Sequence, residues 1–189
     1  FFNNIIDVTP GISASYFSDF DNQIFPGLDF GVKISEKFRA YGNIGTSFRL
    51  PTYTNLYYVW TTTTSNTNLE TEEAFSQEVG FKYLSKNINV SLAAFNRDAD
   101  NLIDYVREDA SDAWQAQNIQ HVNTKGYEAN IEYKFLLNQL PQKIQLGYSF
   151  LDNDVKKSEA NFSQYSINSM KHQFVGNYAM EWFKNFSNS

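Results

Sequence analysis

Residues 127–135 read Tyr-Glu-Ala-Asn-Ile-Glu-Tyr-Lys-Phe and alternate apolar and polar side chains without a break. The odd positions are apolar, and the even positions are polar or charged. A period of two places successive side chains on opposite faces of a β-strand. The stretch therefore predicts a strand with one apolar face and one wet face.

The same alternation recurs along the chain and predicts about eight strands. Residues 88–106 read as one long strand with a bend near 98–100. The connections alternate in length, with short turns at 35–37 and 85–87 and a modest one at 136–142. Long connections are expected at 18–23, 49–73, 108–112 and 153–169. The other alternating stretches are 8–16, 24–34, 78–83, 144–150 and 173–182.

This rhythm of short turns and long loops indicates an all-β fold, an antiparallel up-and-down transmembrane β-barrel. The strands are long enough for the ~9–11 residues that a tilted membrane strand needs. A soluble β-sandwich also has alternating strands with one wet face. The polar faces are rich in Asn, Gln, Ser, Gly and Glu, which suits a wet lumen, so the barrel is favoured and the sandwich stays open.

Composition limits the classes of function. The 189 residues carry a net charge of −6, a pI of about 4.9 and no Lys/Arg cluster, which argues against nucleic-acid binding. Cysteine is absent, which excludes disulfides and thiolate sites. No apolar run reaches the ~18 residues of a transmembrane helix. No linker divides the chain, so residues 1–189 are expected to be a single segment, and Phe1 begins directly in strand-like sequence without a signal peptide.

Several short motifs, taken in order, carry a resemblance. Residues 48–57 read Phe-Arg-Leu-Pro-Thr-Tyr-Thr-Asn-Leu-Tyr, and Asn-Leu-Glu-Thr-Glu follows at 68–72. Related stretches lie at 78–83, 95–104, 118–128 and 171–173. Their order and spacing resemble the barrel wall of TonB-dependent outer-membrane receptors, nearest the cobalamin and siderophore receptor branch. Thr67 and Thr71 stand where that family usually has prolines.

The resemblance implies a barrel of about 22 strands around an N-terminal plug domain. This chain would form a partial barrel of the wall, with the plug, the first strands and the last strands absent. The implied location is the bacterial outer membrane, with membrane lipid as one partner. The implied function is uptake of a siderophore–metal complex, haem or cobalamin, with energy supplied by TonB through other parts of the protein.

The motif positions are expected to shape the barrel. Arg49 has two interpretations: it reaches inward toward plug or ligand, or it forms a structural salt bridge while Pro51 ends the strand. We favour the second, because receptors of unlike substrates share this motif. The positions assigned a structural role are Arg49, Pro51, Asn68, Glu72, Arg97, Asn118 and Gly126.

Aromatic side chains in the long loops are the candidate ligand contacts. Aromatic rings offer large contact areas to planar or corrinoid-like ligands at little entropic cost. They also anchor barrels at the membrane interface without binding a ligand. Both interpretations remain open for Tyr53, Tyr57, Tyr58, Trp60 and Trp114.

Enzymatic chemistry is not expected. His121 and His172 lie on different predicted strands, with no carboxylate or second histidine at ligand spacing nearby. The acidic clusters at 70–73 and 98–104 match no calcium loop. These spacings predict no metal site. No nucleophile elbow and no phosphate-binding glycine loop is present, so no hydrolase site and no cofactor is predicted. Two alternatives remain: a structural or adhesive outer-membrane barrel, and a soluble β-sandwich binding module.

Overall fold

The computed structural model describes residues 5–18, 20, 22–156, 162–164, 170–183 and 186–188. Within these ranges one sheet holds eleven strands, and a single short helix, α1 (Tyr53–Tyr57), interrupts them. No helix in the described ranges is long and apolar enough to cross a membrane. The strands are β1 (Ile6–Ser15), β2 (Gln23–Lys33), β3 (Phe38–Arg49), β4 (Thr63–Thr64), β5 (Glu72–Leu84), β6 (Ile88–Arg107), β7 (Trp114–Leu137), β8 (Leu140–Lys156), β9 (Phe162–Ser163), β10 (His172–Phe183) and β11 (Phe186–Asn188).

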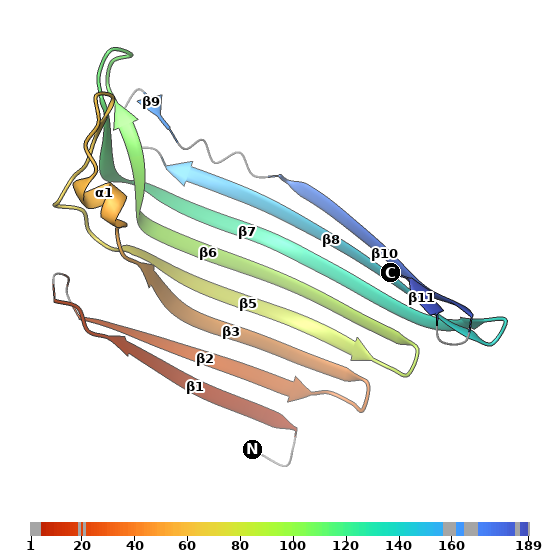
Figure 1. The fold of residues 1–189 in the computed structure, drawn as a ribbon. Helices are drawn as coiled ribbons and strands as arrows, with labels where there is room; N and C mark the ends of the chain where they lie inside the picture. The colour runs from red at the N-terminus through yellow and green to blue at the C-terminus, as the bar shows by residue number, and fades with distance from the viewer. Residues whose placement is uncertain are drawn as a thin grey trace.

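The long strands follow one another across the sheet as antiparallel neighbours, in the order β1-β2-β3-β5-β6-β7-β8-β10-β11 (Figure 1). Eight of them are long, which confirms the predicted number. The short strands β4, β9 and β11 and the helix α1 were not predicted. β4 pairs with β7 and β9 pairs with β6, both off the main path. The result is a curved wall section whose outermost strands in the described chain are β1 and β11.

One face of this wall is apolar from edge to edge. In one row, Ile6 lies opposite Val32, and the row continues through the register partners of each following strand. A second row begins with Val8 opposite Phe30 and crosses the same face. The first row runs Ile6, Val32, Ala40, Phe81, Leu92, Ala129, Tyr148 and Phe174, and the second runs Val8, Phe30, Gly42, Val79, Ala94, Tyr127, Phe150 and His172. Many of these side chains are exposed, as a membrane-facing band requires.

The opposite face is polar along the same strands. Arg39, for example, donates two hydrogen bonds to the carboxylate of Asp7 from across β2, at 2.7 and 2.8 Å. Glu132 of β7 accepts hydrogen bonds from Asn89 of β6 and Gln145 of β8, each at 3.1 Å. A sheet that is apolar on one side and hydrogen-bonded through polar side chains on the other has the two faces expected of a membrane-barrel wall around a wet lumen.

The connections also follow the prediction, with two corrections. The loop predicted at 153–169 starts later, because β8 continues to Lys156, and residues 157–161 and 165–169 of that loop lie outside the described residues. The turns at 35–37 and 85–87 are short, and β6 shifts register between Ala99 and Ile103, where the bend was expected. The modest loop predicted at 136–142 is wrong. β7 and β8 continue to a turn of two residues, Asn138 and Gln139, whose φ angles are 50° and 67°. Such a turn matches the twist of its strands, so the strands run almost to its tip.

Gln139 occupies a left-handed backbone position that costs an L side chain energy. We expect Gln139→Gly to raise the free energy of unfolding by about 1 kcal/mol, because glycine adopts this conformation without strain. A urea unfolding curve of the full-length receptor measures the change. The matched control is Gln173→Gly in extended strand β10, which should lower stability by about 0.5–1 kcal/mol. Equal losses in both variants would contradict the turn assignment.

Candidate functional site

The longest connection between long strands, from β3 to β5, begins and ends at an ion pair. Arg49 and Glu72 are register partners at the ends of β3 and β5. The Nε of Arg49 donates to Glu72 Oε2 at 2.6 Å, and its Nη2 contacts the other carboxylate oxygen. Glu72 is 7% exposed and also accepts a hydrogen bond from the backbone N–H of Ile103 at 2.9 Å. The pair therefore joins β3, β5 and β6 at the loop end of the wall.

Pro51 and Thr52 lead from β3 into α1. Pro51 is buried and has no N–H to leave unpaired. Thr52 caps the helix: the N–H of Asn55 donates to its hydroxyl at 3.2 Å, while the Asn55 side chain accepts from the Thr52 N–H at 2.9 Å. This reciprocal capping box fixes where the helix starts.

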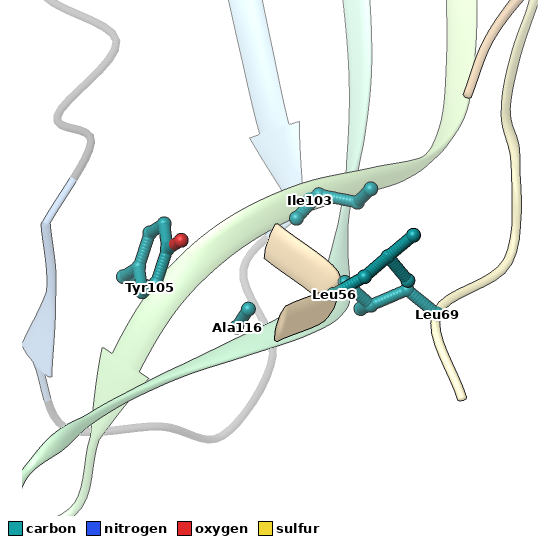
Figure 2. Close-up of a cluster of buried hydrophobic side chains, with 5 residues drawn as sticks. All are labelled: Leu56, Leu69, Ile103, Tyr105 and Ala116. Atoms are coloured by element: carbon teal, nitrogen blue, oxygen red, sulfur yellow. The ribbon is translucent and has the colours of Figure 1, made fainter. Parts of the chain in front are cut away.

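A small apolar cluster holds the connection against the ends of β6 and β7. Leu56 of α1 and Leu69 pack on Ile103 and Tyr105 of β6 and on Ala116 of β7 (Figure 2). Ala116 is fully buried, and each of the others is nearly so. Burying such side chains contributes about 1.5–3 kcal/mol each. We call residues 49–72, where they pack on residues 101–118, the loop base.

Asparagine side chains supply the polar contacts of the loop base. The amide of Asn118 donates to the carbonyl oxygens of Glu70 at 3.0 Å and Asn101 at 2.7 Å. Its own oxygen accepts from the N–H of Glu70 at 2.8 Å. Asn66 donates to the carbonyl of Ala116 at 3.2 Å. These side chains thereby supply hydrogen bonds to the backbone of residues 66–70 and to the register shift of β6 at Asn101.

A buried carboxylate completes the loop base on β6. Asp104 is 1% exposed and accepts from its neighbouring N–H, that of Tyr105, at 2.6 Å. The hydroxyl of Ser163, in the short strand β9, donates to the other carboxylate oxygen. The sequence placed Asp104 only in an acidic cluster. Its burial could not be anticipated, because β9 is a two-residue strand without a pattern.

Four of the predicted ligand contacts are exposed side chains within residues 53–60 of the loop base. The rings of Tyr53 and Tyr57, one helical turn apart, have centroids 5.0 Å apart. Tyr53 is 78% exposed and Trp60 is 66% exposed, and Tyr57 and Tyr58 are also exposed. We call Tyr53, Tyr57, Tyr58 and Trp60 the aromatic patch. Figure 1 shows their segment beside the projecting ends of β6 and β7, at the long-loop end of the wall.

The backbone under the aromatic patch is fixed on both sides. Trp60 and Thr63 exchange two backbone hydrogen bonds, at 2.9 and 3.2 Å. The N–H of Trp114 donates to the carbonyl of Thr62 at 2.9 Å, and β4 runs parallel to β7 from there. The patch is thus presented on an ordered segment.

Trp114 differs from the other four candidates. It is partly buried against the apolar cluster, and the guanidinium of Arg107 lies 4.3 Å from its ring centroid. Arg107 also donates to the carbonyl of Ala110 at 2.7 Å. Trp114 therefore packs within the loop base, between the apolar cluster and the Arg107 guanidinium.

The remaining motif residues are spread along the sheet. Gly126 is buried on β7 beneath the ring of Phe95. Arg97 lies on β6 between Ser76 and Thr124 and is exposed. Asn68 is exposed in a turn, where its N–H donates to the Asn66 side chain at 2.9 Å. The structure thus brings Arg49, Pro51, Glu72 and Asn118 together at the loop base and leaves these three outside its core.

The expectation that His121 lacks carboxylate neighbours is wrong. Its Nδ1 lies 2.6 Å from Asp100 and its Nε2 lies 3.0 Å from Asp98. The bend of β6 brings both carboxylates beside β7, which sequence spacing did not reveal. In the part of the chain that the structure describes, no group of three or more His, Asp or Glu side chains is arranged to hold a metal ion.

Comparison with known proteins decides the family. The family model described as TonB dependent receptor-like, beta-barrel matches residues 2–188. The chain belongs to the TonB-dependent receptor β-barrel family. The match confirms the resemblance drawn from the motifs, and it places the chain in the bacterial outer membrane. The family consists of receptors and transporters and not of enzymes.

Individual relatives agree with this assignment. The vitamin B12 transporter BtuB of Vibrio vulnificus (strain YJ016) is 24% identical over 185 residues, which are 94% of this chain and 30% of that protein. The siderophore receptor PirA of Acinetobacter baumannii superposes with a TM-score of 0.73 at 14% identity, covering 97% of this chain and 30% of that structure. PirA of Pseudomonas aeruginosa gives 0.66 at 20% identity, covering 97% and 38%. The chain thus spans about a third of these relatives.

Proposed function

We propose that this chain is part of a receptor that takes up a scarce, bulky nutrient across the outer membrane with energy supplied through TonB. The nutrient is a siderophore–metal complex, haem or cobalamin. The family match over residues 2–188 carries the proposal. Vitamin B12 transporters and siderophore receptors among the similar proteins support cobalamin and siderophore–metal complexes within this range.

The chain contributes the wall and part of the capture surface in this proposal. The apolar face contacts membrane lipid, and the polar face turns toward a plug domain supplied by another part of the protein. The aromatic patch meets the nutrient from outside, because it lies at the long-loop end and is exposed. The TonB complex acts through the plug, and the chain itself performs no catalysis.

Uptake by the whole receptor tests the proposal. A deletion strain of the source bacterium should lose growth when one nutrient class is the only source of iron or cobalamin. The wild-type gene should restore growth only when TonB is present. A Tyr57→Ala, Trp60→Ala double variant should take up that nutrient at least about tenfold more slowly, because two stacking surfaces are lost. Phe174→Ala, which removes a still more exposed ring on the apolar face, should not slow uptake.

A structural or adhesive barrel remains the second candidate function. It predicts unchanged growth of the deletion strain on every nutrient, together with weaker envelope integrity or surface attachment. That result would overturn the uptake proposal.

A further inference from the structure

The aromatic patch lies in a segment without charged side chains. Residues 50–69 contain no Asp, Glu, Lys, Arg or His, although they form most of the longest loop. Arg49 and Glu70 flank the segment, and Arg49 is paired with Glu72. The exposed side chains of the segment are aromatic rings, hydroxyls and amides, together with the aliphatic Val59. A ligand that lies on this surface therefore meets ring faces and neutral hydrogen-bonding groups.

The surroundings of the patch are acidic. Residues 49–73 and 101–118 carry seven carboxylates against two arginines. The second arginine, Arg107, is held over the Trp114 ring and by the Ala110 carbonyl. Two of these seven carboxylates, Glu70 and Glu73, line a cavity of about 560 Å³ beside the loop base. Both arginines of these two stretches are thus already engaged.

An anionic ligand has little to gain on this surface. The strongest side-chain contacts that a protein offers an anion are charge-assisted hydrogen bonds from arginine or lysine. An acidic surround also repels an approaching anion and lowers its association rate. A neutral ligand with ring faces avoids both costs, and it buries area against rigid aromatic side chains at low entropic cost.

We propose that the aromatic patch selects an uncharged ring-bearing solute, fringed by amides or hydroxyls, and rejects anionic metal complexes. This inference rests on the proposed receptor function and narrows its substrate class. Two sources share the chemistry: a neutral corrinoid and a neutral oligosaccharide. Both present ring faces to the tyrosine and tryptophan rings and polar edges to the threonine and asparagine groups.

Binding by the purified full-length receptor in detergent tests the inference with three probes. Cyanocobalamin is the neutral corrinoid, maltoheptaose is the neutral oligosaccharide, and ferric enterobactin is the anionic complex. We expect one neutral probe to bind, with an affinity that changes less than about twofold between about 50 and about 500 mM salt. Trp60→Ala should weaken that binding about tenfold or more, and Phe174→Ala should leave it unchanged.

Two variants that place opposite charges at Tyr58 show whether the bound ligand is neutral or anionic. For a neutral ligand, Tyr58→Lys and Tyr58→Glu should weaken binding by similar factors, because both remove the same ring. For an anionic ligand, the lysine should strengthen binding and the glutamate should weaken it. Both substitutions lie on an exposed position, so folding should survive them.

Each outcome of these binding experiments either supports or overturns the inference of a neutral ligand. Binding of either neutral probe with equal Tyr58 effects supports the inference and names the source. Salt-sensitive binding of ferric enterobactin, strengthened by Tyr58→Lys, overturns the inference while the uptake function stands. Failure of both neutral probes also overturns it, and the growth experiment then decides separately whether the receptor function fails.

Discussion

Replacing Gly126 with valine is expected to prevent assembly of the barrel. A Cβ atom on Gly126 would lie 2.4 Å from Cζ of Phe95 and 2.7 Å from the carbonyl oxygen of Phe150. The ring could rotate away, but the Phe150 carbonyl belongs to the adjacent strand β8 and cannot. Overpacking of this kind costs about 3 kcal/mol or more. The measurement is the amount of folded, heat-modifiable receptor in outer membranes.

Gly176→Ala is the matched control. Its Cβ would meet only Cδ2 of Leu146 at 3.7 Å, an ordinary contact, so the receptor should fold at the wild-type level. Adding Phe95→Ala to Gly126→Val should recover only part of the folded protein, because the carbonyl contact remains. Normal assembly of Gly126→Val alone would show that Phe95 and β8 do not pack on Gly126 as described.

Replacing Glu72 with alanine is expected to release the loop base from the wall. The carboxylate is buried and serves both Arg49 and the Ile103 N–H. Its removal leaves a buried donor without its acceptor and frees the arginine, at a cost of about 2–4 kcal/mol. Limited proteolysis of the full-length receptor should then cleave residues 50–71 at least about tenfold faster than in the wild type.

The neighbouring residue provides the control. Glu73 is exposed on the other side of the same strand, and its replacement by alanine should change the cleavage rate by less than about twofold. If Glu72→Ala and Glu73→Ala are cleaved equally slowly, the ion pair does not hold the loop base. Arg49→Lys should give an intermediate rate, because lysine keeps the charge but loses the two-point contact.

The sheet could be predicted from the sequence because its strands carry their own pattern. Residues 127–135 alternate so regularly that the face of each side chain follows directly, and the structure pairs Tyr127 with Phe150 on the apolar face. The two-residue turn at Asn138 and Gln139 was not predicted, because it lacks the glycine that such hairpin turns usually contain. The strands β4 and β9 escaped it because two residues cannot show a period.

The loop base could be predicted only in part. Arg49, Glu72 and Asn118 were assigned a structural role from their motifs, and their contacts are consistent with it. The side chains that assemble around them lie far apart in the chain: Asn118 bonds to Glu70, and Ser163 bonds to Asp104. No local pattern records such contacts. The ligand-binding role of the aromatic patch stays a prediction, and exposure on an ordered segment is what the structure adds.

Cysteine scanning with lipid-borne quenchers tests directly whether the apolar face of the wall contacts membrane lipid. The chain contains no cysteine of its own, so single substitutions here add one labelling site each. Leu92→Cys and Ala129→Cys are register partners on the apolar face, and Ser91→Cys and Asn130→Cys are partners on the polar face. A fluorophore on the first pair should be quenched by quenchers on lipid acyl chains, and on the second pair it should not. Equal quenching at all four positions would contradict the account.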